Sequence, residues 1–590
     1  MKVGQPCGLM KPCHLVKPVS ATRVRGRYLT HQKGLPSLPV PALQQTCERY
    51  ITALEPILDA DELEHTKELV EEFKKAGGVG RRLQRALEER AQNCENWLSE
   101  WWVQVAYLTY RLPVVVHSSP GLVLPCMNFR DKRGQIRFAA KLIAGVLDFK
   151  TIIDNETLPV ECLGGKPLCM NQYYEVLSSC RIPGLKKDSV VNHAKSSRPP
   201  KHISVIHNFQ FFMLDVYNTD GTPLTTDQLC VQLERICDSS QQAAEEPVGI
   251  LTSQHRDSWG KVYTKLISDK KNQESVSAIQ RSIFTLCLDG AMPKVATEMY
   301  RSCAAIQMLH GGGSQWNSCN RWFDKTLQFI VGEDGTCGAN YEHAPAEGPP
   351  IVALIDHVVE YTRKSEITQH VKVPLPEPQK LHFNITPEIR RDIDEAKKSM
   401  DILAQDVDMK VAVFDQFGKN LPKSHSMSPD AFIQVALQLA YYRMYHQCCA
   451  TYESASLRMF RLGRTDTIRS ASNASAAFVK AFDDHHKQAI NGQAIDRHLL
   501  GLKMTALENK LPLPAIFADK AYNKALHFKL STSQVCATVS CVLVLLCLMA
   551  MALSSFNTCE ETNVMHLAQA IMDALLDMRT LLEQSPRAKL

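Results

Sequence analysis

The sequence predicts an α/β protein with two sizeable domains, because helical and strand-like patterns alternate along its 590 residues. Residues 59–76 carry apolar side chains at helical spacing, whereas Leu327, Phe329 and Val331 alternate as in a strand. A proline-containing stretch at 366–390 looks like a crossover between two large halves. The length is sufficient for both halves to bury a large core.

Composition is typical of a soluble globular protein and excludes several functions. Hydrophobic residues make up 45% of the sequence and charged residues 22%, and the net charge is +5. No Lys/Arg-rich block would follow a phosphate backbone, so we expect no nucleic-acid partner. The 20 cysteines include no C-x-x-C pair, which argues against a zinc site or a disulfide framework, and we predict no metal ligands. Free, mostly buried cysteines are typical of a reducing compartment.

The two ends carry signals that resemble cellular addresses. Residues 1–33 are basic, and the first acidic residue is Glu48. Such a leader is typical of a mitochondrial transit peptide, although its prolines also fit a disordered basic tail. Ala588-Lys589-Leu590 is a variant of the S-K-L peroxisomal signal. We therefore expect the mitochondrial matrix, and the peroxisome through the C-terminal tripeptide.

One apolar run requires a choice between membrane and core. Cys541 to Leu553 is a run of thirteen residues without a charge, which is too short to span a bilayer as a helix. A buried strand or a core helix is the structure we expect there. We predict a protein without a transmembrane segment.

Local signals order the elements of the first half. The prolines of residues 35–41 predict a stiff extended segment. The helix at 59–76 has Asp59 or Asp61 as its cap and is followed by Gly77-Gly78. The next helical stretch contains Trp97, Trp101 and Trp102.

Further along, a strand and a turn are expected. Ile203, Val205, Phe209 and Phe211 alternate as in one strand. Asp220-Gly221 then makes a turn.

A second strand signal leads to a histidine. Glu333-Asp334-Gly335 turns the strand at 327–331 back, and the returning strand delivers His343 in the segment YEHAPAEG, residues 341–348. Such a histidine can act as a general base near neutral pH, because its reference pKa is about 6.5. Glu347, four residues on, can hold the ring directly or through a second group. By itself this pattern fits a satisfied histidine in a turn better than a base.

Another local signal predicts an anion site. Ser428-Pro429-Asp430 is typical of a helix start, with serine at the N-cap and proline at the first position. Residues 431–440 are apolar nearly all round, so this helix should be buried. Lys419 and Lys423 lie just upstream, and lysines beside a helix N-terminus suit a phosphate or pyrophosphate. Two solvated loop lysines would fit the same pattern.

Longer motifs spread across the chain agree with the histidine. They are Glu95–Trp102 (ENWLSEWW), residues 167–174 (PLCMNQYY), Asn320–Lys325 (NRWFDK), Thr465-Asp466-Thr467 and Ser531-Thr532-Ser533. Together they resemble the carnitine/choline acyltransferase family over about residues 35–534, and again from about 554 to 590.

The resemblance implies two domains of the chloramphenicol-acetyltransferase (coenzyme A-dependent acyltransferase) type, with an active-site tunnel at their interface. Coenzyme A would enter from one side and carnitine from the other, and a short acyl group such as acetyl would pass between them without an acyl-enzyme. The expected segments are a leader at 1–33, helices at 34–93 packing on the C-terminal domain, an N-terminal domain at 94–385 and a C-terminal domain at 386–590. We expect a monomer with no permanently bound cofactor and with acetyl-CoA as a substrate.

The resemblance also assigns roles to individual residues. His343 is the base, Glu347 its partner and Ser533 the hydroxyl nearest the reacting carbonyl. The coenzyme A contacts are Lys419, Lys423, Asp430 and Gln534. The carnitine contacts are Tyr452, Ser454, Thr465, Arg497, Trp102, Tyr107 and Ser531, and Arg497 should also lie close to Glu347. Carnitine has a carboxylate and choline has none, so Thr465 and Arg497 favour carnitine.

Two segments depart from the family pattern. Between Asp484 and Ala489 the chain looks shortened, and a family arginine near coenzyme A has no counterpart. At 536–553 the apolar run replaces a Gly/Pro-containing strand and loop, and a large side chain at Leu543 would limit the pocket to short acyl groups. The alternatives are a medium-chain (octanoyl) acyltransferase, or a folded variant that binds coenzyme A but turns over poorly.

A different enzyme class has one matching motif. His310-Gly311-Gly312-Gly313 resembles the oxyanion loop of lipases and esterases. That class also needs a G-x-S-x-G nucleophile turn, which this sequence lacks.

Overall fold

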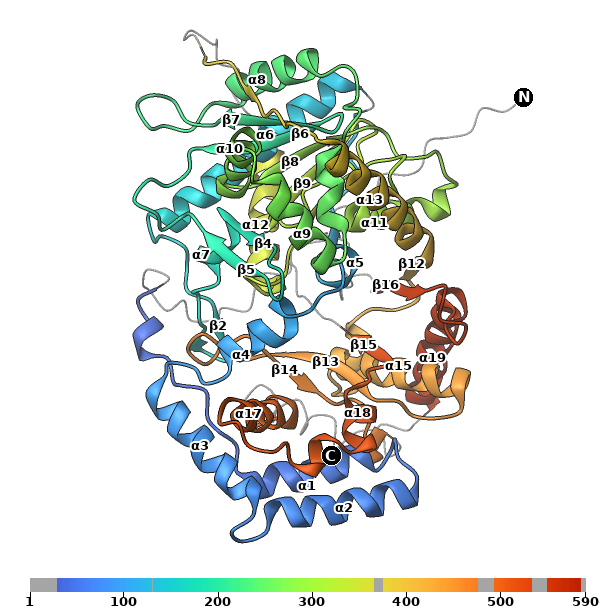
Figure 1. Cartoon of the computed structure of the whole chain (residues 1–590). Helices are drawn as coiled ribbons and strands as arrows, with labels where there is room; N and C mark the ends of the chain where they lie inside the picture. Colours follow the sequence, from blue (N-terminus) through green and yellow to red (C-terminus); the bar gives the residue numbers. More distant parts are fainter. Residues whose placement is uncertain (1–28, 130, 365–374, 476–492, 533–548, 585–590) are drawn as a thin grey trace, which may run out of the picture.

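The computed structural model describes residues 29–129, 131–364, 375–475, 493–532 and 549–584 (Figure 1). Ser533, Gln534, the segment at 484–489, the C-terminal tripeptide and most of the basic leader lie outside these ranges. The described chain combines helices with one large sheet and several small ones. This mixed architecture agrees with the α/β class expected from the sequence.

A seven-stranded sheet forms the centre of the first half, with the strand order β1-β10-β9-β8-β6-β7-β11. In that order the strands are Gly121–Val123, Cys337–Tyr341, Leu327–Gly332, Thr285–Asp289, His202–His207, Gln210–Asp215 and Gln379–Lys380. β6, β8 and β9 are parallel to one another, and the other neighbours are antiparallel.

Helices cover both faces of this sheet. One face packs on α6 (Lys132–Asp154), α8 (Thr226–Ser239) and α12 (Gly348–Arg363). The other packs on α9 (Arg256–Leu266), α10 (Lys270–Arg281), α11 (Tyr300–His310) and α13 (Pro387–Asp406). Consecutive strand residues such as Val205 and Ile206 are therefore buried in opposite cores. α13 follows the expected domain boundary at 385 yet packs on the first half, and the boundary itself stays a prediction.

The prediction of one strand from Ile203 through Phe211 is wrong. β6 ends at His207, and Asn208 and Phe209 adopt positive φ angles of 48° and 62°, so the chain reverses and returns as β7. A two-residue turn with two positive φ angles matches the twist of paired strands. The alternating pattern came from two adjacent strands, with Phe209 in the turn between them.

Two other local predictions are confirmed. α2 (Ala60–Lys74) begins after Asp59, whose side chain accepts a hydrogen bond from Glu62 N at 2.8 Å. β9 and β10 form the expected hairpin, and Gly335 adopts a φ of 85° in its turn.

The tryptophan-rich stretch is helical only in part. Trp101 and Trp102 lie in α4 (Ser99–Val103), whereas Trp97 precedes this helix. α4 continues as one turn of π-helix at Gln104–Leu108, a distortion that is frequent at functional sites.

The second half contains smaller sheets. β13 (Thr451–Ser456) lies between β14 (Thr465–Ile468) and β15 (Leu530–Thr532), and β12 (Val407–Phe414) pairs with β16 (Met549–Phe556). α15 (Pro429–Tyr445) and α19 (Val564–Gln584) pack beside these strands. Ser428 is the N-cap of α15, as the sequence predicts.

The apolar run is described only at its end. Met549–Leu553 belongs to β16, and Met551 is buried against α15 and α19. Within the described ranges, no helix is long and apolar enough to cross a membrane.

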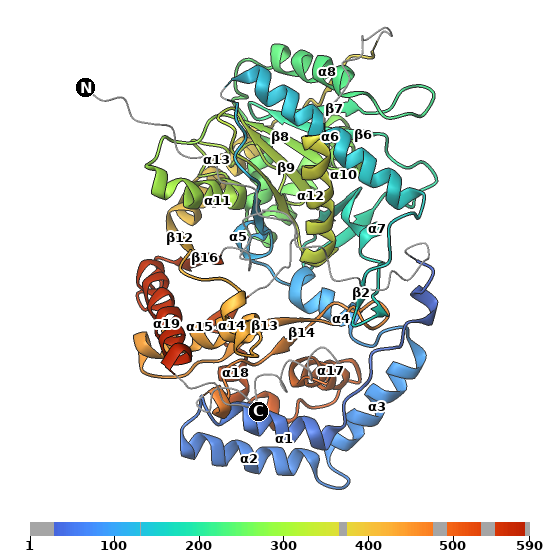
Figure 2. The ribbon, with the colours of Figure 1, turned by 180° about the vertical axis from the view of Figure 1, so that it is seen from behind.

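The N-terminal helices share a core with the second half. α1 (Leu43–Leu54), α2 and α3 (Val79–Asn93) pack with α17 (Ile495–Glu508) and α18 (Lys520–Leu526), as both views show (Figures 1 and 2). The shorter elements are α5 (Val114–His117), α7 (Tyr173–Val176), α14 (Asn420–Ser424), β2 (Cys162–Leu163) with β3 (Lys166–Pro167), and β4 (Ser179–Ile182) with β5 (Ser189–Asn192).

Candidate active site

His343 lies after β10, in the turn that leads to α12. Its backbone N donates to Ser118 O at 3.1 Å. Pro349 and Pro350 start α12 directly after the turn, where a missing N–H is tolerated. The His343 side chain is 21% exposed. The backbone is therefore held by its neighbours while the ring remains accessible to a substrate.

A tyrosine holds the imidazole of His343. Tyr107 Oη lies 3.1 Å from His343 Nδ1, and the two rings stack with 5.4 Å between centroids and 13° between planes. Burial raises the pKa of Tyr107 well above its usual value, and Glu347 raises it further, so Tyr107 stays a neutral phenol. The phenol can donate to Nδ1 or accept from it. The tautomer that protonates Nδ1 donates to Tyr107 Oη and leaves Nε2 as the basic nitrogen, which is the form that a base at Nε2 requires.

Glu347 faces that second nitrogen. Glu347 Oε2 lies 3.7 Å from His343 Nε2, and Oε1 accepts a hydrogen bond from Arg464 Nε at 2.5 Å. Burial alone would raise the pKa of Glu347, but Arg464, His343 and Arg497 outweigh it and lower the pKa. Glu347 is therefore a carboxylate, placed to stabilise a positive charge on the imidazole.

Arg464 is a site residue that the sequence reasoning missed. Its guanidinium also donates to Ala344 O at 2.7 Å and to His343 O at 3.0 Å. We expected Arg497 beside Glu347, and Arg497 does act on the charge of Glu347, but the direct ion pair is made by Arg464. Arginines also stand at 458 and 461, and no local pattern distinguishes the one that reaches the turn.

Four residues predicted to contact carnitine gather beside this ring: Trp102, Tyr107, Thr465 and Arg497. The Arg497 guanidinium lies over the Trp102 indole at 3.5 Å from the ring centroid, and Arg497 Nε donates to Thr465 O at 3.1 Å. Trp102 and Tyr107 meet edge to face at 6.3 Å. Arg497 Nη2 and Trp102 Nε1 are buried and have no hydrogen-bond partner within the described part of the chain.

The other predicted carnitine contacts lie on neighbouring strands. Tyr452 and Ser454 alternate along β13, so their side chains share a face. Tyr452 pairs with Ser531 of β15 in parallel register. After burial and Glu347, Tyr452 is among the groups that raise the pKa of Tyr107, which indicates that the two phenols are neighbours. The hydroxyl of Thr532 is already engaged, at 3.1 Å from both Gln434 Oε1 and Tyr452 O.

The described residues that are predicted to contact coenzyme A lie around the start of α15. Lys419 directly precedes α14 and Lys423 lies within it, and both side chains are exposed. Asp430 lies in the first turn of α15. Burial and then Asp430 raise the pKa of Glu453 to about 8, so Asp430 and Glu453 are neighbours. Gln534 lies outside the described residues, as does Ser533.

His310-Gly311-Gly312-Gly313 forms a helix end rather than an oxyanion loop. All three glycines have positive φ angles where α11 stops. Their N–H groups are used internally: Gly311 donates to Gln307 O at 3.0 Å, Gly312 to His310 Nδ1 at 3.2 Å and Gly313 to Ser318 Oγ at 2.8 Å. The motif therefore presents no free donors to a substrate.

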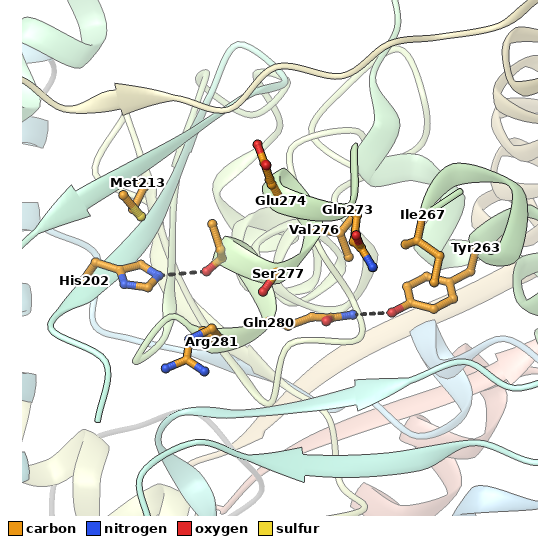
Figure 3. A pocket seen from close by; sticks show the side chains of 11 residues that line it. His202, Met213, Tyr263, Ile267, Gln273, Glu274, Val276, Ser277, Gln280 and Arg281 are labelled. Atoms are coloured by element: carbon orange, nitrogen blue, oxygen red, sulfur yellow. Dashed lines mark hydrogen bonds between the residues drawn. The ribbon is translucent and has the colours of Figure 1, made fainter. Parts of the chain in front are cut away.

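A cavity of about 600 Å³ lies elsewhere, where α9 and α10 meet β6 and β7 (Figure 3). Two hydrogen bonds join residues of the lining, with His202 Nε2 2.8 Å from Ala278 O and Gln280 donating to Tyr263 Oη at 2.9 Å. The lining includes neither the histidine turn nor any predicted substrate contact, so we assign it no part in this site.

Comparison with known proteins matches most of the chain. The sequence profile of choline/carnitine O-acyltransferases matches residues 38–559. Carnitine O-acetyltransferase of Columba livia is 59% identical over 98% of both chains, and that of Homo sapiens is 58% identical over 99% of both. Choline O-acetyltransferase of Rattus norvegicus is 38% identical over 93% of this chain and 92% of that protein.

Among solved structures, the one describing condensation domain-mediated chain release from the enacyloxin polyketide synthase aligns over 84% of both chains. Its sequence identity is 9% and its TM-score 0.29, too low for any conclusion. The sequence comparisons are decisive by themselves. The chain belongs to the choline/carnitine O-acyltransferase family.

Proposed function

We propose that this chain transfers an acetyl group reversibly between coenzyme A and the hydroxyl of carnitine. The observation that carries the proposal is the 58–59% identity, over nearly full length, to proteins named carnitine O-acetyltransferase. The site agrees with it, because a partly exposed histidine is held at one nitrogen and faces a carboxylate with the other. A reversible transfer needs one group that serves as base in both directions.

The reaction follows from His343 acting as that base. Nε2 takes the proton of the carnitine hydroxyl while the oxygen attacks the carbonyl carbon of the thioester. The tetrahedral intermediate collapses, the carbon–sulfur bond breaks, and the imidazolium returns its proton to the thiolate. The reverse reaction begins with the thiol of coenzyme A instead. Glu347 stabilises the imidazolium, and no acyl-enzyme forms because the two substrates react directly.

Arg497 and Trp102 support carnitine rather than choline as the acceptor. Each has a buried N–H group without a partner among the described residues. Such a group costs free energy unless a bound acceptor completes it. The carboxylate of carnitine is such an acceptor, and choline has none. Thr465 O accepts from Arg497, and Tyr452 and Ser454 lie on the neighbouring strand β13. Aromatic faces suit a trimethylammonium group.

The oxyanion donor is proposed to be Ser533, with Ser531 beside the carnitine. The support is the resemblance of Ser531-Thr532-Ser533 to the family motif, together with the hydrogen bonds that already occupy the hydroxyl of Thr532. Thr532 Oγ1 is engaged by Gln434 and by the backbone of Tyr452. A donor from this segment therefore has to come from a residue next to Thr532.

The two substrates are proposed to enter from opposite sides of the contact between the halves. His343 follows a strand of the first half, whereas Arg464, Arg497 and Tyr452 come from the second. Lys419 and Lys423, with Asp430 and Gln534, are the proposed coenzyme A contacts, because exposed lysines at a helix start suit its phosphates. Two chloramphenicol-acetyltransferase-type domains, the tunnel between them and a monomeric state remain part of the proposal.

The test is turnover by the full chain. Release of coenzyme A from acetyl-CoA should be fast with carnitine and slow with choline. Octanoyl-CoA as donor in the same assay tests the medium-chain alternative, which predicts a preference for the longer acyl group. Calorimetric titration with coenzyme A tests the other alternative, which rests on the atypical composition of residues 536–553. Binding without turnover would contradict the proposal.

Localisation is proposed from sequence signals alone. The basic leader favours the mitochondrial matrix, and Ala588-Lys589-Leu590 favours the peroxisome. The full chain and a Leu590→Asp variant, both tagged at an internal loop, should differ in their peroxisomal fraction. Equal fractions would refute the peroxisomal part.

A further inference from the structure

We propose that Arg181 is a positioning residue for the base His343. Its buried guanidinium donates both to Glu342, the residue before His343, and to the backbone of Tyr107, whose side chain contacts the His343 ring. This inference rests on the function proposed above, and it concerns a residue outside the substrate contacts. Arg181 lies in β4, and its side chain is 1% exposed.

The guanidinium of Arg181 reaches three acceptors in three directions. Nε donates to Asp188 Oδ2 at 2.7 Å, Nη1 to Glu342 Oε1 at 2.9 Å and Nη2 to Tyr107 O at 2.6 Å. A planar group with several donors at set angles fixes the relative positions of its acceptors more closely than an ammonium does. Arg181 thus ties the strand β4 to two segments that are far apart in sequence.

Glu342 carries this constraint to the backbone of His343. Its Oε1 accepts from Arg181, and its Oε2 accepts from Ala344 N at 3.2 Å. The carboxylate therefore bridges across His343, from the residue before it to the residue after it. Glu342 N also donates to Thr326 O at 3.0 Å, so the turn is held to the sheet at the same place.

Tyr107 carries the constraint to the imidazole. Arg181 holds its carbonyl oxygen, while its ring stacks on His343 and its hydroxyl lies at Nδ1. Asp188 strengthens the same hold, because its backbone N donates to Leu108 O at 2.9 Å. The backbone and the ring of His343 are thus both positioned by the buried guanidinium of Arg181, through Glu342 and Tyr107 respectively. A shift of about 1 Å at a reacting group can cost 10²-fold in rate.

Arg256 provides a matched control. It is as buried as Arg181, and its Nε donates to the same Asp188 oxygen at 2.7 Å. Its Nη1 donates to Asp324 Oδ1 at 2.7 Å instead of reaching Tyr107 or Glu342. Loss of either arginine disturbs the same ion cluster, but only loss of Arg181 releases the base.

The experiment compares Arg181→Lys with Arg256→Lys in the full chain. Lysine keeps the charge, but its single nitrogen cannot take the three positions from which the guanidinium donates. We expect kcat of Arg181→Lys to fall about 10-fold to 100-fold, with KM for acetyl-CoA and carnitine changed less than about twofold. Arg256→Lys should lower the thermal midpoint similarly and keep kcat within about twofold. Equal losses of kcat in both variants, or a change confined to KM or stability, would overturn the inference.

A double-mutant cycle with Tyr107→Phe tests whether the effect passes through that ring. Residues that act through one another are non-additive. The loss of kcat caused by Arg181→Lys should therefore be at least about threefold smaller in the Tyr107→Phe background. Equal losses in both backgrounds would contradict the inference.

If Arg181→Lys does not fold, Glu342→Gln supplies the same test. It keeps the shape of the side chain and weakens both of its bonds, so kcat should fall while both KM values hold. An unchanged kcat would refute the inference. The wild-type chain separates the two proposals: absence of acetyl transfer there refutes the proposed function, whereas a failure confined to the variants refutes only the role of Arg181.

Discussion

Two regions differ in how many of their polar groups have protein partners: the turn around His343, and the binding face, by which we mean the residues proposed to contact substrates, Arg497, Trp102, Lys419 and Lys423. In the turn, both ring nitrogens, the backbone N and O of His343 and the carboxylate of Glu347 all face protein partners. On the binding face, Arg497 Nη2 and Trp102 Nε1 lack partners among the described residues, and the lysines near α15 are exposed. The proposed base is thus held by protein contacts alone, whereas the residues proposed to bind carnitine keep N–H groups that a substrate could complete.

The largest expected effect comes from removing the positioned base. His343→Ala should lower kcat by about 10²- to 10⁴-fold, the usual contribution of a general base, with both KM values little changed because the binding face is intact. Steady-state assays of coenzyme A release measure this. The control is His357→Ala on α12, whose ring pairs with Asp148 at 2.7 Å and which should turn over normally. Undiminished transfer in His343→Ala would remove the basis of the mechanism.

The binding face should respond in KM instead. Arg497→Lys should raise KM for carnitine about tenfold, since a hydrogen bond to a charged group contributes about 1.5–3 kcal/mol, and should leave KM for acetyl-CoA unchanged. The preference for carnitine over choline should narrow by the same factor. The control is Arg469→Lys, a buried arginine paired with Asp496 at 2.7 Å. If Arg497→Lys prefers carnitine over choline as strongly as the wild type does, Arg497 does not contact the carboxylate of carnitine.

A smaller effect is expected at the exposed lysines. Lys419→Ala combined with Lys423→Ala should raise KM for acetyl-CoA about three- to tenfold at low salt, and less at high salt because exposed charges are screened. Titrating acetyl-CoA at two ionic strengths measures this. Lys67→Ala on α2 is the control and should change neither value. An effect that does not depend on salt would argue against a phosphate contact.

The smallest effect concerns stability. Burial and Asp430 raise the pKa of Glu453 from 4.5 to about 8. Between these two pH values the folded protein keeps a proton on Glu453 that the unfolded chain has released. Stability from this group is present below about pH 4.5 and is lost as pH rises towards 8. The free energy of unfolding of Glu453→Gln should therefore exceed that of the wild type by about 1 kcal/mol or more at pH 8, and by much less near pH 5.

Urea denaturation at the two pH values checks this last prediction. The exposed Glu360→Gln serves as control and should show no such dependence on pH. A Glu453→Gln gain of equal size at both pH values would mean that packing, not ionisation, is responsible. It would also remove the contrast between this acid and Glu347, which Arg464 keeps ionised.

Local geometry was predictable from the sequence, whereas the ion pairs that hold the histidine turn were not. The caps at Asp59 and Ser428 and the hairpin before His343 depend on residues a few positions apart, which leave a readable pattern. Arg464 and Glu347 are 117 positions apart, and Arg181 and Glu342 are 161 apart. Ion pairs between such distant segments have no period and no spacing, so one sequence does not show them.

Two local errors have a physical reason as well. The sequence predicts one strand from Ile203 to Phe211 because the two-residue turn at Asn208 and Phe209 contains no glycine or proline to mark it. It also predicts Trp97 in the same helical stretch as Trp101 and Trp102, whereas the helix begins at Ser99. Ser533 and Gln534 stay predictions, since they lie outside the described residues.

Arg464 reaches the histidine turn from the second half of the chain, 117 positions after Glu347, so the turn is completed only by a segment that is made later. A nascent polypeptide that has emerged only as far as α12 already contains the imidazole and its carboxylate, but not the guanidinium that gives the carboxylate its counter-charge. The ion pair that keeps Glu347 charged can therefore form only after the second half of the chain has been made and has packed against the histidine turn.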